Sequence, residues 1–235
     1  MVRQVWVIFF LTVFTLACIP ASAYAQQNAE QFAMHLQLLN RTPATRNPQF
    51  KTWQNIMDAR VLDGNRQLVG SLEDLKIDEN GSVSELVSEI SWVGDKNEIV
   101  KHPIGETTFL SGKNFFEVPL SVNADNRVTS PEALAAIAPA AGGGKLYSFK
   151  AMKGAQVLNT GGNWVGIVKD LLIDDEMRAV QALVLEDVPG ARRYTEIAIP
   201  FDTEHISVNT RYDRIEFRLN PAAAKAVTDF ARDSR

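Results

Sequence analysis

The alternation of apolar and polar positions along this chain occurs twice in nearly the same form. The stretch LVGSLEDLKIDE begins at Leu68, and WVGIVKDLLIDD begins 96 positions later at Trp164. When Val61 is aligned with Val157, eight of the nineteen positions up to Glu79 are identical. A match of this length in constant register indicates a tandem duplication of a unit of roughly 70 residues, too few copies for a solenoid.

The apolar positions change parity halfway along each of these stretches. Trp164 and Val168 share one parity, whereas Leu171 begins the opposite one. Because neighbouring side chains on a strand point to opposite faces, a regular strand would leave one of these sets outside the core. A β-bulge near Lys169-Asp170, and near Glu73-Asp74 in the first copy, resolves the conflict and bends the strand. Strongly bent strands are typical of small closed barrels.

The whole pattern predicts an all-β fold with peripheral helices: two tandem small β-barrels, each followed by a helix. Helix starts are indicated by Ser130-Pro131 and Asn220-Pro221, since proline suits the first helical position. The segment 28–40 also predicts a short amphipathic helix. In chain order we expect a signal peptide at 1–25, an N-terminal segment with a short helix at 26–52, a first barrel at 53–122, a helix and Gly-rich linker at 123–147, a second barrel at 148–219 and a C-terminal helix at 220–235. Cutting at the linker AGGGK is expected to give two halves that fold separately.

The first 25 residues are typical of a secretory signal peptide. Arg3 gives a positive start, the run from Val5 to Ile19 is almost wholly apolar, and Ala23-Tyr24-Ala25 forms a small-x-small cleavage site. We therefore expect cleavage after Ala25 and a periplasmic location. An uncleaved N-terminal anchor is the alternative, and membrane association is expected only in that case.

Charge and cysteine content narrow the function classes. The chain has 24 Lys+Arg against 28 Asp+Glu, and its only cysteine, Cys18, lies within the predicted signal. A net-negative chain is poorly suited to nucleic-acid binding, which needs a concentrated basic face. Without Cys18 the mature chain has no disulfide and no cysteine metal ligand. The expected partner is therefore another protein or an envelope component.

The ordered motif of the second copy resembles the PRC-barrel domain family. It comprises Gly161, the strand from Trp164 to Asp174, a valine-rich strand and then Ile199-Pro200-Phe201, which the first copy replaces by His102-Pro103-Ile104. Relatives include the photosynthetic reaction-centre H subunit and the C-terminal domain of a ribosome maturation factor. In both, the barrel is a docking or assembly module without catalytic residues. The resemblance implies a non-enzymatic adaptor that acts through its barrel surfaces and uses no cofactor.

The residues that we single out are structural, with no catalytic, cofactor-binding or metal-binding assignment. They are Gly70, Asp74, Asp78, Gly166, Asp170, Asp174 and Pro200. The glycines are expected to allow close backbone approach or a positive φ at the bend. The aspartates are expected to accept backbone N–H bonds at the bulges and turns. Trp164 and its counterpart Leu68 are expected in the core or as end caps.

Two other function classes remain open. The acidic residues Asp170, Asp174, Asp175 and Glu176 could hold a hard cation in a metal-binding envelope protein, although their spacing is not that of an EF-hand loop. A hydrolase with a site at the inter-domain cleft is the second alternative. The histidines at positions 35, 102 and 205 are far apart and form no recognised ligand or catalytic motif.

Overall fold

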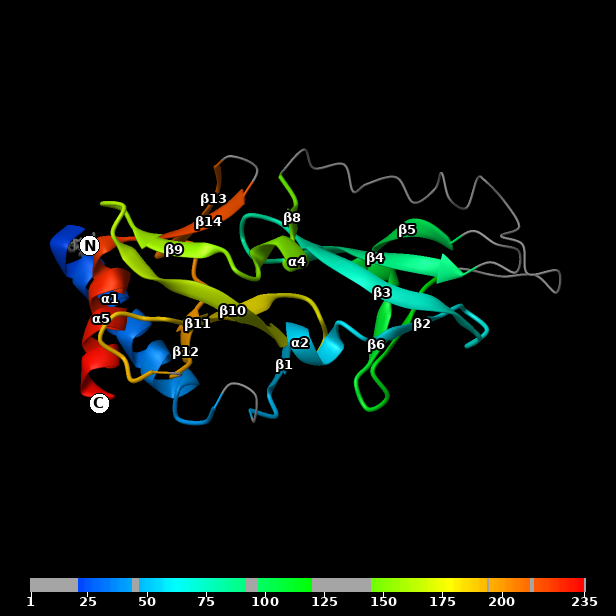
Figure 1. The fold of residues 1–235 in the computed structure, drawn as a ribbon, viewed down its shortest axis with the longest axis horizontal. Coiled ribbons are helices and arrows are strands. Elements are labelled where there is room, and N and C mark those ends of the chain that lie inside the picture. The colour runs from blue at the N-terminus through cyan, green and yellow to red at the C-terminus, as the bar shows by residue number, and fades with distance from the viewer. Residues whose placement is uncertain are drawn as a thin grey trace, which may run out of the picture.

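Two seven-stranded β-sheets form the computed structural model of this protein. The structure describes residues 21–43, 47–91, 97–119, 145–193, 195–211 and 214–234. The helices are few and lie around the sheets (Figure 1). The prediction of a mostly β protein with peripheral helices is therefore confirmed.

The first sheet has the strand order β5-β4-β3-β2-β7-β6, and a further strand, β8, pairs with β3. Its strands are β2 (Arg60–Leu62), β3 (Leu68–Ile77), β4 (Val83–Ser91), β5 (Asn97–Pro103), β6 (Thr108–Leu110), β7 (Phe115–Glu117) and β8 (Tyr147–Ser148). A short 3-10 helix, η2 (Ile104–Glu106), connects β5 to β6. Strands β2 and β7 are parallel, and the other neighbours are antiparallel.

The second sheet repeats this topology in the order β12-β11-β10-β9-β14-β13, with β1 added to β10. Its strands are β1 (Phe50–Thr52), β9 (Gln156–Asn159), β10 (Trp164–Asp174), β11 (Val180–Glu186), β12 (Ile197–Pro200), β13 (Ile206–Arg211) and β14 (Arg214–Leu219). Here β9 and β14 are the parallel pair, as β2 and β7 are in the first sheet. The internal repeat in the sequence is thus a repeat in three dimensions.

The predicted β-bulges are confirmed in both central strands. The register of β3 against β4 shifts between Leu72 and Asp74, and that of β10 against β11 shifts between Val168 and Asp170. The extra residue lets apolar side chains on both sides of the bulge point into the core. Leu72 and Leu75 are accordingly both buried despite their different parity.

Each copy of the repeat donates a strand to the sheet of the other copy. Strand β1 precedes the first copy in the chain but pairs with β10, where Thr52 lies opposite Leu172. Strand β8 precedes the second copy but pairs with β3, where Ser148 lies opposite Lys76. These two pairings occupy equivalent positions in the repeat. The two halves are therefore related by a pseudo-two-fold axis and are interwoven through their backbones.

The tips of the central hairpins meet at this pseudo-axis. The N–H of Val83 donates to the carbonyl of Arg178 at 2.7 Å, and the N–H of Val180 donates to the carbonyl of Gly81 at 2.9 Å. Gly81 has φ +82°, and a Cβ there would lie 2.5 Å from the ring of Phe201. The contact between the halves is thus too close for a side chain at this turn.

Two short helices pack against each other in the same region. Helix α2 (Trp53–Ile56) follows β1, and α4 (Phe149–Met152) follows β8. The buried rings of Trp53 and Phe149, which are equivalent in the repeat, have centroids 5.4 Å apart. One cluster of buried apolar residues continues through both halves of the chain.

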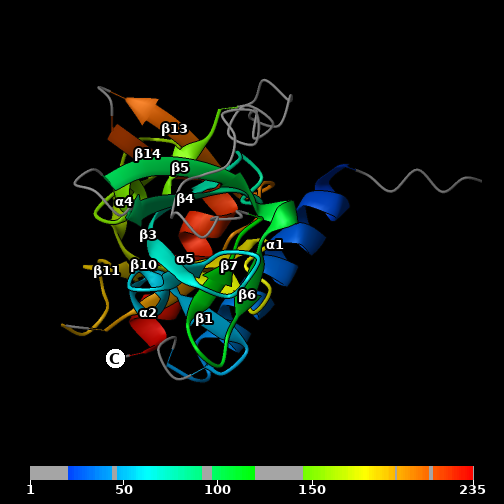
Figure 2. The same ribbon diagram turned by 90° about the vertical axis from the view of Figure 1, so that its right-hand side faces the viewer.

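Helices α1 (Ala21–Leu39) and α5 (Pro221–Asp233) contact each other beside the second sheet, and α1 lies along its outer flank (Figure 2). The expected amphipathic helix at 28–40 is part of α1, whose Phe32 and Leu36 are buried. The side chain of Asn220 caps α5 by accepting the N–H of Ala223 at 2.9 Å. The helix expected after the first barrel, and the linker AGGGK except Lys145, lie outside the described residues.

The predicted signal peptide stays a prediction. Its residues 1–20 lie outside the described part of the chain, and α1 already begins at Ala21, before the expected cleavage point at Ala25. Among the helices within the described ranges, none is both long and apolar enough to cross a bilayer.

Candidate functional site

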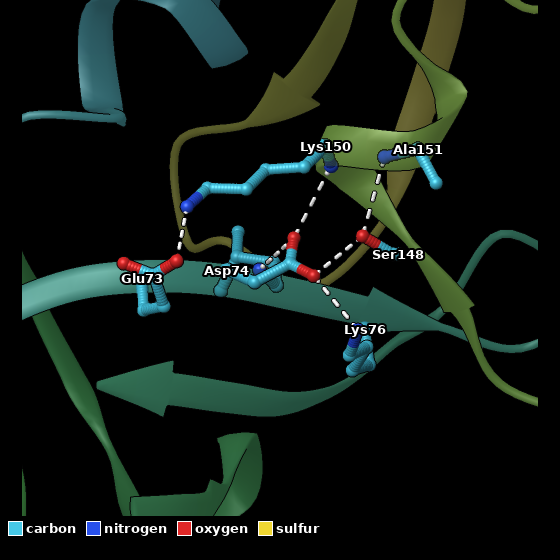
Figure 3. Close-up of polar contacts among 7 residues, drawn as sticks. Glu73, Asp74, Lys76, Ser148, Lys150 and Ala151 are labelled. Atoms are coloured by element: carbon cyan, nitrogen blue, oxygen red, sulfur yellow. Dashed lines mark hydrogen bonds and ion pairs between the residues drawn. The ribbon is translucent and has the colours of Figure 1, made fainter. Parts of the chain in front are cut away.

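Asp74, directly after the bulge in β3, binds the strand and helix that the second copy contributes (Figure 3). Its Oδ1 accepts the N–H of Leu75 at 2.9 Å and that of Lys150 at 3.2 Å. Its Oδ2 accepts the hydroxyl of Ser148 at 2.5 Å and the ammonium of Lys76 at 2.8 Å. One carboxylate thus joins two segments that are 74 residues or more apart in the chain.

The neighbouring side chains complete this contact. Ser148 is the N-cap of α4, and its Oγ also accepts the N–H of Ala151 at 3.2 Å. Lys150 forms an ion pair with Glu73, the bulged residue of β3 (Figure 3). Because both partners of this pair are about half exposed, it adds less than the buried hydrogen bonds of Asp74.

Asp170 makes the equivalent contact in the opposite direction. Its Oδ1 accepts the N–H of Leu171 at 2.8 Å and the N–H of Gln54, in α2, at 3.3 Å. Burial raises the pKa of the Asp170 carboxyl, although these backbone N–H groups and the nearby Lys153 act to lower it. The equivalent of Ser148 here is Thr52, which caps α2 through Asn55. We name the two contacts, made by Asp74 and Asp170, the reciprocal aspartate contacts.

The sequence pointed to both aspartates but not to their partners. Thr52 and Ser148 stand at aligned positions of the repeat, and each is followed by an aromatic residue. Serine and threonine are preferred N-cap residues, so a pair of matched caps was a signal available before the structure. The pattern gives no indication that each cap would face the other copy.

The other singled-out residues lie where the backbone is crowded or turns. A Cβ at Gly70 would lie 2.1 Å from the carbonyl oxygen of Glu89, and one at Gly166 would lie 3.0 Å from that of Glu186. Both are cases of close approach, and neither has a positive φ. Pro200 is the last residue of β12 and is buried.

Asp78 and Asp174 close the tips of the two central hairpins. Asp78 Oδ1 accepts the N–H of Asn80 at 2.9 Å and of Ser82 at 2.8 Å. Asp174 accepts the N–H of Arg178 at 2.8 Å through Oδ1. These carboxylate oxygens stabilise the turns, which is a common role of Asp at the ends of strands.

The expectation that Trp164 and Leu68 lie in the core or as end caps is wrong. Their exposed fractions are 40% and 56%. The Trp164 indole N–H donates to the carbonyl of Asp187 at 3.3 Å, and the side chain remains partly exposed. Both residues are the first of a central strand, at the end away from the other copy.

A groove of about 790 Å³ lies between the segment that links α4 to β9 and the hairpin formed by β13 and β14. Ala155 and Ile215 line its floor, and Lys153, Arg211 and Arg214 bring three positive charges to it. The carboxylate of Glu216, the one acidic group among the described lining residues, accepts Nε–H of Arg218 at 2.7 Å. Among the residues that the structure describes, the lining includes no histidine, serine, cysteine or aspartate.

A buried serine–histidine pair lies elsewhere, in the first sheet. The hydroxyl of Ser88 is 2.8 Å from Nε2 of His102, and neither residue is exposed. Burial lowers the pKa of His102 to about 4, and within the described residues its Nδ1 has no partner. The second copy has Leu185 and Ile199 at these positions. Since no substrate can reach it, the pair is a polar substitution within the core and not a catalytic dyad.

A metal centre has no support in the described ranges, where no three His, Cys, Asp or Glu side chains converge. Asp170 and Asp174 use their oxygens on backbone N–H groups. His205 forms a hydrogen bond with Asp202 at 2.9 Å and packs on Phe32, with ring centroids 4.8 Å apart.

The comparisons with known proteins return no matching family model and no matching curated protein.

Proposed function

We propose that this chain is a non-enzymatic binding or assembly protein of the bacterial envelope, built from two PRC-type barrels and exported to the periplasm. The repeated order of strands and the bulged central strands support the barrel interpretation. The N-terminal sequence pattern supports the location.

The groove beside β13 and β14 is the observation that carries the proposal. Its volume lies within the range of ligand sites in proteins. It has charged groups that can bind, and its described lining contains no nucleophile with an adjacent base, which acyl transfer or hydrolysis by side chains needs. Because the two halves are interwoven through their strands, we expect the protein to bind as a rigid body, without a hinge movement that would expose the groove.

The hydrolase alternative places a site between the two halves. That region is occupied by the paired hairpin tips and by the packed rings of Trp53 and Phe149. In the same region, the carboxylates of the reciprocal aspartate contacts already accept hydrogen bonds from the opposite copy. The arrangement therefore favours binding over catalysis.

Capture from an envelope extract of the source organism tests the proposal. The tagged full chain should retain a discrete partner, and Arg214→Glu should lose it because the substitution reverses a groove charge. Arg192→Glu is the matched control, since Arg192 is an exposed arginine on a loop outside the groove lining. Equal capture by both variants would contradict the assignment of the groove as the binding surface.

A further inference from the structure

The groove in the second copy exists because one hairpin is longer than its counterpart. In the first copy, β6 and β7 form three residue pairs, and the last is Leu110 with Phe115. In the second copy, β13 and β14 continue for two more pairs, Thr210 with Ile215 and Arg211 with Arg214. This extension forms one wall of the groove.

The first copy closes the equivalent space with its own backbone. Asn114, with φ +54°, lies in the turn of this short hairpin, directly before β7. Its carbonyl accepts the N–H of Arg60 at 3.2 Å, and its side-chain amide donates to the carbonyl of Asn55 at 3.1 Å. The hairpin extension that forms this wall is therefore specific to the second copy.

The residues that open the groove also supply its charge. Arg211 and Arg214 stand on the hairpin extension, and Lys153 faces them from the segment after α4. Met57 occupies the position of Lys153 in the first copy. Because Arg218 pairs with Glu216 and Arg211 has an interaction of its own, the positive charge that the described lining offers to a ligand rests on Lys153 and Arg214, in a chain whose formal net charge is −4.

We propose that this groove binds a phosphate ester, with the phosphate between Lys153 and Arg214 and the ester's apolar part over Ala155 and Ile215. A phosphate monoester carries more charge and more acceptor oxygens than one carboxylate, so it suits several cations at once. Within the described residues, Arg214 has no ion-pair partner. The inference rests on the proposed function, because it assigns a ligand class to the same groove.

Two sources could supply the same group: a soluble phosphate ester or the phosphate of a lipid headgroup. Titration of the full chain with glycerol 3-phosphate, followed by backbone NMR shifts, tests the first source. Co-sedimentation with phosphatidic acid vesicles, compared with phosphatidylcholine vesicles, tests the second. Saturable binding in either arm supports the proposal if Arg214→Glu weakens it by at least roughly tenfold, as expected from the loss of a charge-assisted hydrogen bond.

Lys153→Glu provides a second variant, and Arg192→Glu should bind as the unaltered chain does. Absence of binding in both arms overturns the proposal, as does binding that neither groove variant weakens. Equal affinity for succinate, a dicarboxylate, also overturns the assignment to phosphate. If phosphate binding fails while Arg214→Glu still loses its envelope partner, only the ligand class is wrong and the proposed function stands.

Discussion

Replacing Asp74 by alanine tests whether the two copies stabilise each other through the reciprocal aspartate contacts. The side chain is only 6% exposed. Its removal leaves the N–H groups of Leu75 and Lys150 and the hydroxyl of Ser148 without this acceptor. Each buried donor without a partner costs roughly 1–3 kcal/mol. With the lower value for these three groups, we expect a loss of about 3 kcal/mol in the free energy of unfolding.

The measurement is urea denaturation of the full chain, followed by far-UV circular dichroism. Asp78→Ala is the matched control, because the Asp78 carboxylate accepts two N–H bonds within its own exposed turn and, among the described residues, forms no hydrogen bond with the other copy. We expect the control to lose about 1 kcal/mol. A double-mutant cycle of Asp74→Ala with Ser148→Ala should give a coupling of about 1 kcal/mol between the copies. A loss for Asp74→Ala no larger than that of the control, or a coupling near zero, would refute the reasoning.

Four further variants separate the local effects. Gly70→Ala should lower the free energy of unfolding by about 3 kcal/mol, because the added Cβ would lie 2.1 Å from a carbonyl oxygen. Gly166→Ala should lower it by only about 1 kcal/mol, because the corresponding distance is 3.0 Å. A larger loss of thermal stability for Gly166→Ala than for Gly70→Ala would contradict this. Asp170→Asn should leave stability at pH 7 unchanged or raise it, because burial raises the pKa of this carboxyl and the amide oxygen still accepts both N–H bonds; a loss comparable to that of Asp74→Ala in urea denaturation would count against it. The pKa of His102 is lowered from 6.5 to about 4, so the unfolded state binds the proton more readily and stability should decrease by about 3 kcal/mol as the pH falls from 6.5 to 4. His102→Leu should remove that part of the pH dependence, and an unchanged slope in urea titrations would contradict the burial argument.

Much of the fold follows from the apolar pattern, because parity is a local property. The change of parity around Glu73 and Lys169 required a bulge in each central strand, and the helix at Asn220 began where its cap and proline predicted. The pairing of strands β1 and β8 could not be predicted from the apolar pattern. They have only three and two residues, and no periodic pattern can say which sheet such a short strand joins.

The candidate site was less predictable than the fold. The groove depends on the length of one hairpin and on charged residues that also suit a solvated loop, so the sequence around Arg214 carries no specific signal. Trp164 misled for a physical reason: an apolar residue at the first position of a strand lies beyond the layer that buries the rest. Whether such a side chain is buried depends on what covers that end of the sheet. The alternation of apolar and polar residues does not contain this information.

The exchange of β1 and β8 changes what we expect of the chain when it is divided. Tandem barrels joined by a flexible linker suggest two halves that fold alone. Each half of this chain, however, would lose a strand of its sheet, the reciprocal aspartate contacts and part of a shared core. We therefore expect neither half, separated at the linker, to reach the stability that it has in the intact protein.

Differential scanning calorimetry of the intact chain tests the central claim, that strand exchange makes the two copies one cooperative unit. The account predicts a single transition in which the calorimetric and van't Hoff enthalpies agree. Asp74→Ala should move that whole transition to lower temperature without splitting it. Two transitions in the intact chain, with only one of them moved by Asp74→Ala, would contradict the account.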